Sequence, residues 1–294
     1  MKKRDFLEQK EQFILEEKFN EKAGKTLVHY RRIIETFIDF LPDDKEITKK
    51  DIIDYKNELL TKHKPSTISN YITVANKYIK YVEIIEKNGE FDLEEFKKHK
   101  SKLTVKNIKI QQKSSLDEVL EPEEFKRMLR IAKKSKQMDM YYIMKIIAYT
   151  GIRINELNYF TVESIQSNYI EVRNKGKIRK IILRNDLKKE LINYCKENNI
   201  VSGLIFNGKK EDVMMHQTTI WKRLRKIAGM CRGIKLEKVH AHSFRHLFAM
   251  KFIAEGGNIA ELADILGHAS VDTTRIYVRS TDYQKRKRLE KMRY

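Results

Sequence analysis

Several side chains in the second half of the chain suit the chemistry of cutting a phosphodiester bond. A tyrosine oxygen can attack phosphorus, although a phenol has a pKa of roughly 10 and the phosphate oxygens repel a nucleophile. Arginine forks can balance the charge that builds on the non-bridging oxygens, and a lysine or an imidazole can move protons. The side chains that together supply this inventory are Arg153, His242, Arg245, His268 and Tyr277, with one lysine from a predicted hairpin tip that presents Lys175, Lys177, Arg179 and Lys180.

Each of the four segments that carry these residues has an ordinary structural interpretation when it is taken alone. Arg153 in TGIRINEL would usually face outward from a helix, and basic hairpin tips are usually solvated. His242 and Arg245 lie three positions apart, on one face of a predicted helix, where a capping residue and a surface residue are common. The four segments together favour a catalytic interpretation. The inventory needs no metal and no cofactor, and we expect neither.

The composition favours a folded protein that binds a polyanion. The chain of 294 residues is 41% hydrophobic and has a formal charge of +20, which indicates nucleic acid as a partner. Cys195 and Cys231 form no CxxC or Cys/His spacing, so the sequence predicts neither a zinc site nor a disulfide framework. Since no stretch approaches the roughly 20 apolar residues of a membrane span, we expect a cytoplasmic, nucleoid-associated bacterial protein without membrane contact.

Helical periodicity dominates the first part of the chain. Apolar residues recur at spacings of three and four in residues 27–41, 47–60 and 64–85, which predicts a small helical bundle over residues 1–97. Thr48 is the expected N-cap of the second of these helices. Residues 98–115 are polar and basic without a helical stripe, and they predict an extended linker.

Residues 116–294 predict a second domain that is mostly helical and contains one β-hairpin. YIEVR and IRKIIL alternate apolar and polar residues on either side of a glycine turn, which is typical of a hairpin. Residues 139–150 predict a buried helix, and a further helix is expected to open near Asp272 and to carry Tyr277. The predicted fold class is mainly α with a small β-sheet.

The motifs TGIRINEL, NKGK, HSFRH, and LGHAS followed by TTRIY resemble, in this order, the signature of the tyrosine recombinases of the lambda-integrase and Xer type. The resemblance covers the whole chain. It implies a SAM-like helical core-binding domain that clamps DNA, followed by an α+β tyrosine-recombinase catalytic domain. The implied activity is site-specific recombination of DNA.

The resemblance also implies a role for each matched residue. Tyr277 would attack the scissile phosphate and leave a 3′-phosphotyrosyl link and a free 5′-hydroxyl. Arg153 and Arg245 would clamp the non-bridging oxygens, to which His268 would add a hydrogen bond. His242 would assist proton movement.

Two further roles concern the general acid and a supporting carboxylate. Lys175 would protonate the 5′-oxygen, but the hairpin turn is about one residue shorter than is usual in the family, so Lys177 is the alternative. Glu156 matches an acidic position of the family and would orient its neighbours.

Candidate DNA contacts lie on two predicted helices, on the hairpin and beside His242. On the same segments, Trp221 is expected in the core, and His246 is expected to be structural because it follows Arg245 on a different helix face. The candidate DNA-contacting residues are Lys64, Thr67, Asn70, Lys177, Arg179, Gln217, Thr218, Thr219, Lys222, Arg223 and Ser243.

The expected partners are double-stranded DNA and further copies of the chain. We expect a dimer on one recombination site and a tetramer in synapsis, with subunit contacts through the C-terminal tail and cleavage in cis. Accessory DNA-bending proteins are further candidates. Two alternatives stay open, a type IB topoisomerase-like enzyme that relaxes DNA and a non-catalytic DNA-binding protein. Inversion, chromosome-dimer resolution, and integration or excision all use this chemistry, and the sequence does not choose among them.

Overall fold

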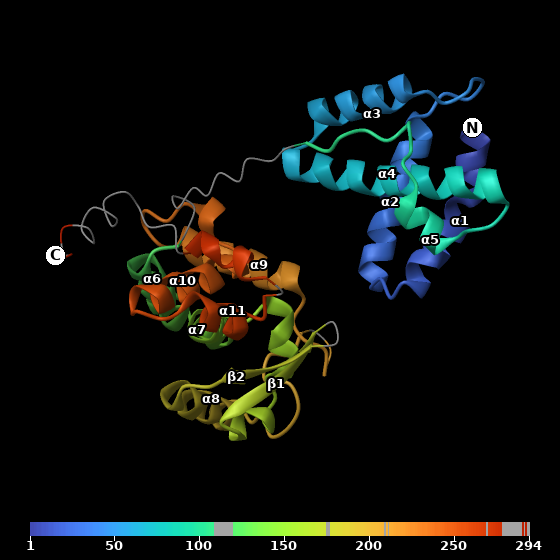
Figure 1. Ribbon diagram of the computed structural model, residues 1–294. Helices are drawn as coiled ribbons and strands as arrows, with labels where there is room; N and C mark the ends of the chain where they lie inside the picture. The colour runs from blue at the N-terminus through green and yellow to red at the C-terminus, as the bar shows by residue number, and fades with distance from the viewer. Residues whose placement is uncertain are drawn as a thin grey trace. The chain divides into compact units, whose positions relative to one another are not determined.

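The chain forms two compact units, Met1–Lys113 and Ser114–Tyr294, and each is considered by itself. The computed structural model describes residues 1–108, 120–174, 177–208, 210, 212–268, 270–277, 290 and 292, without the side chains of residues 174, 177 and 276. Most of the described elements are helices, and two strands form a small sheet (Figure 1). Among the described residues, no helix is both long and apolar enough to cross a membrane.

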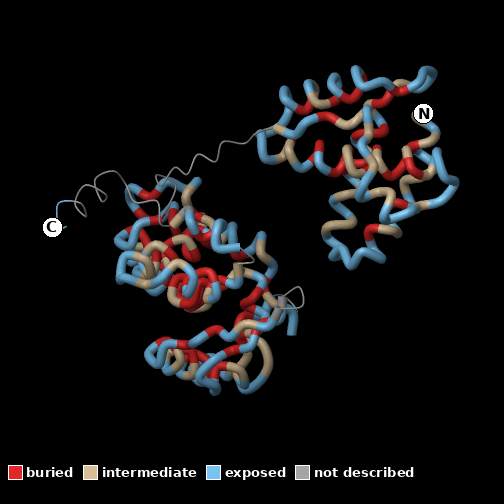
Figure 2. Tube along the Cα trace, viewed as in Figure 1, coloured by how far each residue is buried: buried red, intermediate tan, exposed pale blue. Residues whose placement is uncertain are grey.

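The first unit is a bundle of helices around α4. Its elements are α1 (Lys3–Phe19), α2 (Gly24–Phe40), α3 (Lys49–Lys62), α4 (Pro65–Asn88) and α5 (Leu93–Lys98). The inner faces of these helices carry the buried residues (Figure 2), and α1, α2 and α4 meet around Phe6, Phe37 and Tyr78. The expected N-cap is confirmed, because Thr48 directly precedes α3 and its backbone N–H donates to the carboxylate of Asp51 at 2.8 Å.

Residues 101–108 pack against the helices of the first unit and belong to it, although the sequence places them in an extended linker. The side chain of Asn76 on α4 donates to the carbonyl of Val105 at 2.8 Å and accepts from its N–H at 3.0 Å. Val105 is buried in the core of this unit. An irregular segment that is fixed by hydrogen bonds to distant side chains leaves no helical pattern in the sequence, which is why the segment resembles a linker.

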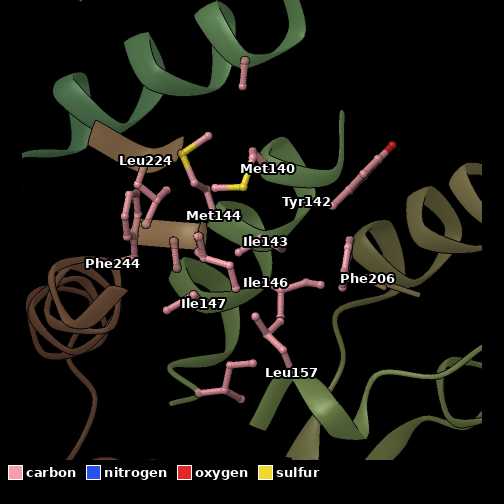
Figure 3. Close-up of a cluster of buried hydrophobic side chains, with 14 of the residues drawn as sticks. Met140, Tyr142, Ile143, Met144, Ile146, Ile147, Leu157, Phe206, Leu224 and Phe244 are labelled. Atoms are coloured by element: carbon pink, nitrogen blue, oxygen red, sulfur yellow. The ribbon is translucent and has the colours of Figure 1, made fainter. Parts of the chain in front are cut away.

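The second unit is built around α7, which is buried along most of its length. The helices of the unit are α6 (Pro122–Lys134), α7 (Met138–Thr150), α8 (Asn185–Glu197), α9 (Gln217–Gly229), α10 (Ala241–Ala254) and α11 (Ile259–Leu266). Figure 3 shows Ile143, Met144 and Ile147 of α7 with Leu224 of α9 and Phe244 of α10 around them. The predicted buried helix is therefore confirmed.

The predicted hairpin is also confirmed. Strands β1 (Tyr169–Asn174) and β2 (Lys177–Ile182) pair antiparallel, with Val172 opposite Arg179. Ile170, Val172 and Ile181 are buried, as the alternation of apolar residues requires. Residues 175 and 176 of the turn lie outside the described part of the chain.

Short 3-10 helices replace two of the α-helices that the sequence predicts near the site. Arg153 precedes η2 (Ile154–Tyr159), and the tyrosine segment folds into η5 (Val271–Thr273) and η6 (Arg275–Tyr277). Further 3-10 helices among the described residues are η3 (Ser164–Gln166) and η4 (Leu236–Lys238). Segments this short, anchored by neighbouring side chains, adopt the tighter turn because they are too short to gain from α-helical hydrogen bonding.

Candidate active site

Arg245 is the most buried cation of the site. It lies on α10 with only 3% of its surface exposed. Its guanidinium donates to the carbonyl of Gly151 at 2.6 Å and to the carbonyl of Leu266 at 2.7 Å. These carbonyls end α7 and α11, where the helix dipoles favour a positive charge. Burial, with Arg153 and Arg179 nearby, lowers the pKa of Arg245 to about 10, so the group stays charged at neutral pH.

Arg153 lies at the entrance of the same site. Its side chain is 32% exposed, and its guanidinium donates to the carbonyl of Gly267 at 3.1 Å. A second guanidinium nitrogen lies 3.4 Å from the carboxylate of Glu156. Arg153 is therefore oriented by its neighbours and keeps part of its surface free to meet a ligand.

Glu156 connects two arginines. Its carboxylate is almost fully buried and accepts from the backbone N–H of Arg153 at 2.7 Å and from Arg179 at 2.5 Å. Arg179 also donates to the carbonyl of Ile265, in the last turn of α11. The sequence places Arg179 on the hairpin as a candidate DNA contact, whereas in the structure its guanidinium points inward and joins β2 to η2 and α11. Burial lowers the pKa of Arg179, and Glu156 opposes this shift.

His268 follows the left-handed turn that ends α11. Gly267 has a φ of +62°, and a Cβ at this position would lie 2.8 Å from Cδ of Arg179, so only glycine fits without movement. In His268, Nε2 lies 3.0 Å from a guanidinium nitrogen of Arg245, and Nδ1 lies 2.7 Å from the hydroxyl of Thr274. Burial and the charge of Arg245 lower the pKa of His268 to about 4, which keeps the imidazole neutral at pH 7.

Tyr277 is half-buried on η6, which packs against α10. Its ring lies 5.2 Å from the ring of His246, centroid to centroid, at an angle of 54°. Burial raises the pKa of the phenol, while the positive charges of Arg245 and Arg153 lower it. The tyrosine therefore lies within electrostatic reach of both arginines, although they are far from it in sequence.

His246 is the residue beside the site that the sequence interpretation missed. It was expected to be structural, but its ring contacts Tyr277, and burial lowers its pKa to about 4. The missed signal is its spacing, because His246 follows His242 by four positions and so lies on the same helix face.

The structure says less about the two remaining catalytic candidates, His242 and the lysine of the hairpin. His242 is exposed in the first turn of α10, and desolvation together with the charge of Arg245 lowers its pKa. Lys175 lies outside the described residues, and the side chain of Lys177 is not described. Both lysines thus stay predictions, as does the choice between them.

The candidate DNA contacts on α9 differ in whether their side chains already bond to other residues of the protein. Thr219 and Lys222 are exposed, but Gln217 donates to Asn155, and Arg223 pairs with Asp139. The hydroxyl of Thr218 lies 2.8 Å from Nδ1 of His216, the N-cap of the helix.

Trp221 on the same helix was expected in the core, and this expectation was wrong. Its side chain is 43% exposed, with the guanidinium of Arg225 4.9 Å from the ring. Apolar character alone does not tell a core aromatic from one on an exposed helix face.

The other candidate DNA contacts lie in both units. Lys64 and Asn70 are exposed at the start of α4 and Thr67 is partly buried there, with the amide of Asn70 2.7 Å from Nε2 of His29. Ser243 is buried, and its hydroxyl donates to the carbonyl of Lys238. All of these contacts with DNA stay predictions.

Comparison with known proteins identifies the class. Residues 118–284, more than half of the chain, match the model of the phage integrase family. A protein named tyrosine recombinase from Pseudothermotoga lettingae is 26% identical over 275 residues, which cover 90% of each chain. Tyrosine recombinase XerA from Pyrococcus furiosus is 31% identical over 173 residues, which cover 57% of this chain and 59% of that protein.

A solved structure supports the fold. The crystal structure of the XerH site-specific recombinase bound to a palindromic difH substrate matches with a TM-score of 0.71 at 20% identity, over 97% of this chain and 84% of that one. The chain belongs to the phage integrase family, the tyrosine recombinases. It is an enzyme that cleaves and rejoins DNA.

Proposed function

We propose that the protein is a site-specific recombinase whose nucleophile is Tyr277. The observation that carries the proposal is the meeting of Arg153, Arg245, His268 and the tyrosine from three separate segments, with both arginines acting on the pKa of the phenol. Two guanidinium groups fixed in one site suit the binding of a phosphate, whose oxygens accept hydrogen bonds from both.

Cleavage would begin with attack of the Tyr277 oxygen on the scissile phosphorus. The phenol oxygen forms a bond to phosphorus, the bond from phosphorus to the 5′-oxygen breaks, and the phenol proton passes to a base. The product is a 3′-phosphotyrosyl link. Lys175 is the proposed donor of a proton to the 5′-oxygen, with Lys177 as the alternative. Rejoining reverses these steps when a 5′-hydroxyl attacks the phosphotyrosine.

The arginines would supply most of the transition-state stabilisation. Arg245 is fixed by two carbonyls and Arg153 by Gly267 and Glu156, so neither has to reorganise when charge develops on the non-bridging oxygens. His268 would add a hydrogen bond to the same oxygens, and His242 would assist proton movement. We expect the reaction to proceed without a metal.

We further propose that two copies bind one site and that four copies form the synaptic complex. The tail that would join neighbouring subunits falls almost entirely outside the described residues, so its role rests on the family resemblance. Inversion, chromosome-dimer resolution, and integration or excision are equally compatible with this chemistry.

The test is the capture of the covalent intermediate. Genomic fragments that the protein retains would be sequenced, and a retained site would be made as a duplex with a nick just downstream of the cleavage position. The short cleaved piece that carries the free 5′-hydroxyl then diffuses away. Wild-type protein should give an adduct that survives SDS, and Tyr277→Phe should give none. Tyr283→Phe is the matched control and should keep the adduct.

Two outcomes would contradict the proposal. An undiminished adduct with Tyr277→Phe would exclude this nucleophile, and the lack of any adduct with wild type would favour a non-catalytic DNA-binding protein. Relaxation of supercoiled plasmids that lack the site would favour the topoisomerase-like alternative.

A further inference from the structure

The imidazole of His268 has a defined partner at each ring nitrogen. A guanidinium nitrogen of Arg245 lies 3.0 Å from Nε2, and the hydroxyl of Thr274 lies 2.7 Å from Nδ1. A guanidinium can only donate, so Nε2 must accept, and the single proton of the neutral ring is on Nδ1. The protein without DNA therefore holds the Nδ1–H tautomer, which donates to Thr274.

The proposed role in cleavage requires the other tautomer. A hydrogen bond from His268 to a phosphate oxygen needs the proton on Nε2, the atom that faces Arg245. When the phosphate takes over this guanidinium, a neutral ring must carry its proton on Nε2 and leave Nδ1 bare. Nδ1 then needs a donor where it previously needed an acceptor.

Thr274 can be both. A hydroxyl accepts from Nδ1–H or donates to bare Nδ1 by rotating its own proton, whereas a carbonyl can only accept and an ammonium can only donate. The side chain of Thr274 is fully buried, so its proton has few competing partners. Its carbonyl also accepts from the backbone N–H of Tyr277 at 3.0 Å, so the residue holds His268 by its side chain and Tyr277 by its main chain.

We propose that Thr274 is a positioning residue whose hydroxyl keeps the ring of His268 aimed at the phosphate in both tautomers. The inference rests on the proposed function, because it assigns the His268 hydrogen bond to strand cleavage. A role in filling space does not explain why a threonine stands at this buried position, since valine has nearly the same shape and would bury no hydroxyl. The need for a hydroxyl is the distinguishing feature.

The neighbouring threonine offers a matched control. Thr273 is exposed, and its hydroxyl donates to the carbonyl of Ser270 at 2.7 Å rather than to the histidine. Thr273→Val removes a hydroxyl one position away and leaves the partner of His268 in place. Thr274→Val removes that partner, and Thr274→Ser keeps it.

The first measurement needs no DNA and no activity. Long-range ¹H–¹⁵N spectra of the histidine rings, assigned by comparison with His268→Asn, should show a protonated Nδ1 and a bare Nε2 in the wild type, in Thr274→Ser and in Thr273→Val. Thr274→Val should keep the proton on Nδ1, because Arg245 still donates to Nε2, but its Nδ1–H signal should lose the downfield shift and the slow exchange with water that the hydrogen bond to Thr274 gives. A protonated Nε2 in the wild type, or an unchanged Nδ1–H shift and exchange rate in Thr274→Val, would overturn the inference even if the proposed function holds.

The second measurement is the single-turnover rate of adduct formation on the nicked duplex, with the DNA dissociation constant measured in parallel. Thr274→Val should cleave at least about tenfold more slowly with little change in binding, while Thr274→Ser and Thr273→Val should stay within about threefold of wild type. Equal losses in Thr274→Ser and Thr274→Val, or full activity of Thr274→Val, would refute the role of the hydroxyl. The lack of an adduct with wild type would instead count against the proposed function and leave the spectra to decide the inference.

Discussion

Arg179 and Glu156 form an ion pair of 2.5 Å in which both side chains are largely buried, 13% and 4% exposed. The pair joins the hairpin strand that follows Lys175 to the segment that presents Arg153, and Arg179 continues the connection to the carbonyl of Ile265. The hairpin and Arg153 are thus held in one arrangement by residues that need not touch DNA.

Breaking this pair should damage both stability and catalysis. Arg179→Met leaves the carboxylate of Glu156 short of a partner, and loss of one member of a buried pair typically costs about 3–5 kcal/mol. Urea unfolding should show a loss of this order, and adduct formation should slow. Lys180→Met on the same strand, where the side chain is exposed, is the control and should change stability little. Wild-type stability of Arg179→Met would mean that the pair is dispensable.

Gly267 should tolerate no side chain. Alanine there would adopt a left-handed backbone, which costs roughly 1–2 kcal/mol, and its Cβ would also press on Arg179. Gly256→Ala is the control because Gly256 has a φ of +92° but open space around its Cβ position. Thermal unfolding should show a larger loss for Gly267→Ala than for Gly256→Ala. Equal losses of stability in the two variants would show that the side chain of Arg179 moves away from the added methyl group without a cost in free energy.

The partly buried histidines His246 and His268 predict a pH dependence of stability. The pKa values of His246 and His268 are about 4 in the folded protein, below the usual value of about 6.5. Between about pH 4 and about pH 6.5 the unfolded chain therefore binds more protons than the folded chain. The stabilisation is therefore complete above about pH 6.5 and is lost as the pH falls toward 4. Urea midpoints measured from pH 7 to pH 4.5 should decrease, and less so in the His246→Asn, His268→Asn double variant. An equal decrease in that variant would assign the effect to other groups.

Trp221 should report DNA binding at α9. It is the only tryptophan of the chain, and its exposure together with Arg225 beside it suits a contact with a nucleic acid. Intrinsic fluorescence should change when duplex DNA is added, and Trp221→Ala should weaken binding severalfold. Met230→Ala, an exposed apolar residue just after the end of α9, is the control. Unchanged fluorescence with saturating DNA would place this face of α9 away from the duplex.

The sequence predicts elements better than it predicts the contacts of polar residues. Apolar periodicity correctly locates the buried α7 and the hairpin, and the polar residue before a helix correctly locates the cap at Thr48, because both signals depend on local spacing. The inward orientation of Arg179 and the contact of His246 with Tyr277 depend on segments that are distant in sequence. The spacing places His246 on the helix face of His242, but no local pattern shows which distant residues the side chains of Arg179 and His246 contact.

Local patterns also fail to predict the exposure of Trp221 and the short turns around Tyr277. A period of three or four shows that one face of a helix is apolar, but an additional aromatic can lie at the edge of that face. The tyrosine segment contains helix-compatible residues, yet its backbone follows the bonds to Ser270 and Val271 rather than its own propensity.

The anchoring of Arg245 has a consequence for how this protein can change over generations. Its two firmest partners are main-chain oxygens of Gly151 and Leu266, and these atoms persist whichever side chain stands at those positions. Sequence drift around the guanidinium can alter packing without removing an acceptor. The charged guanidinium of Arg245 is thereby held by main-chain oxygens, which a substitution does not remove.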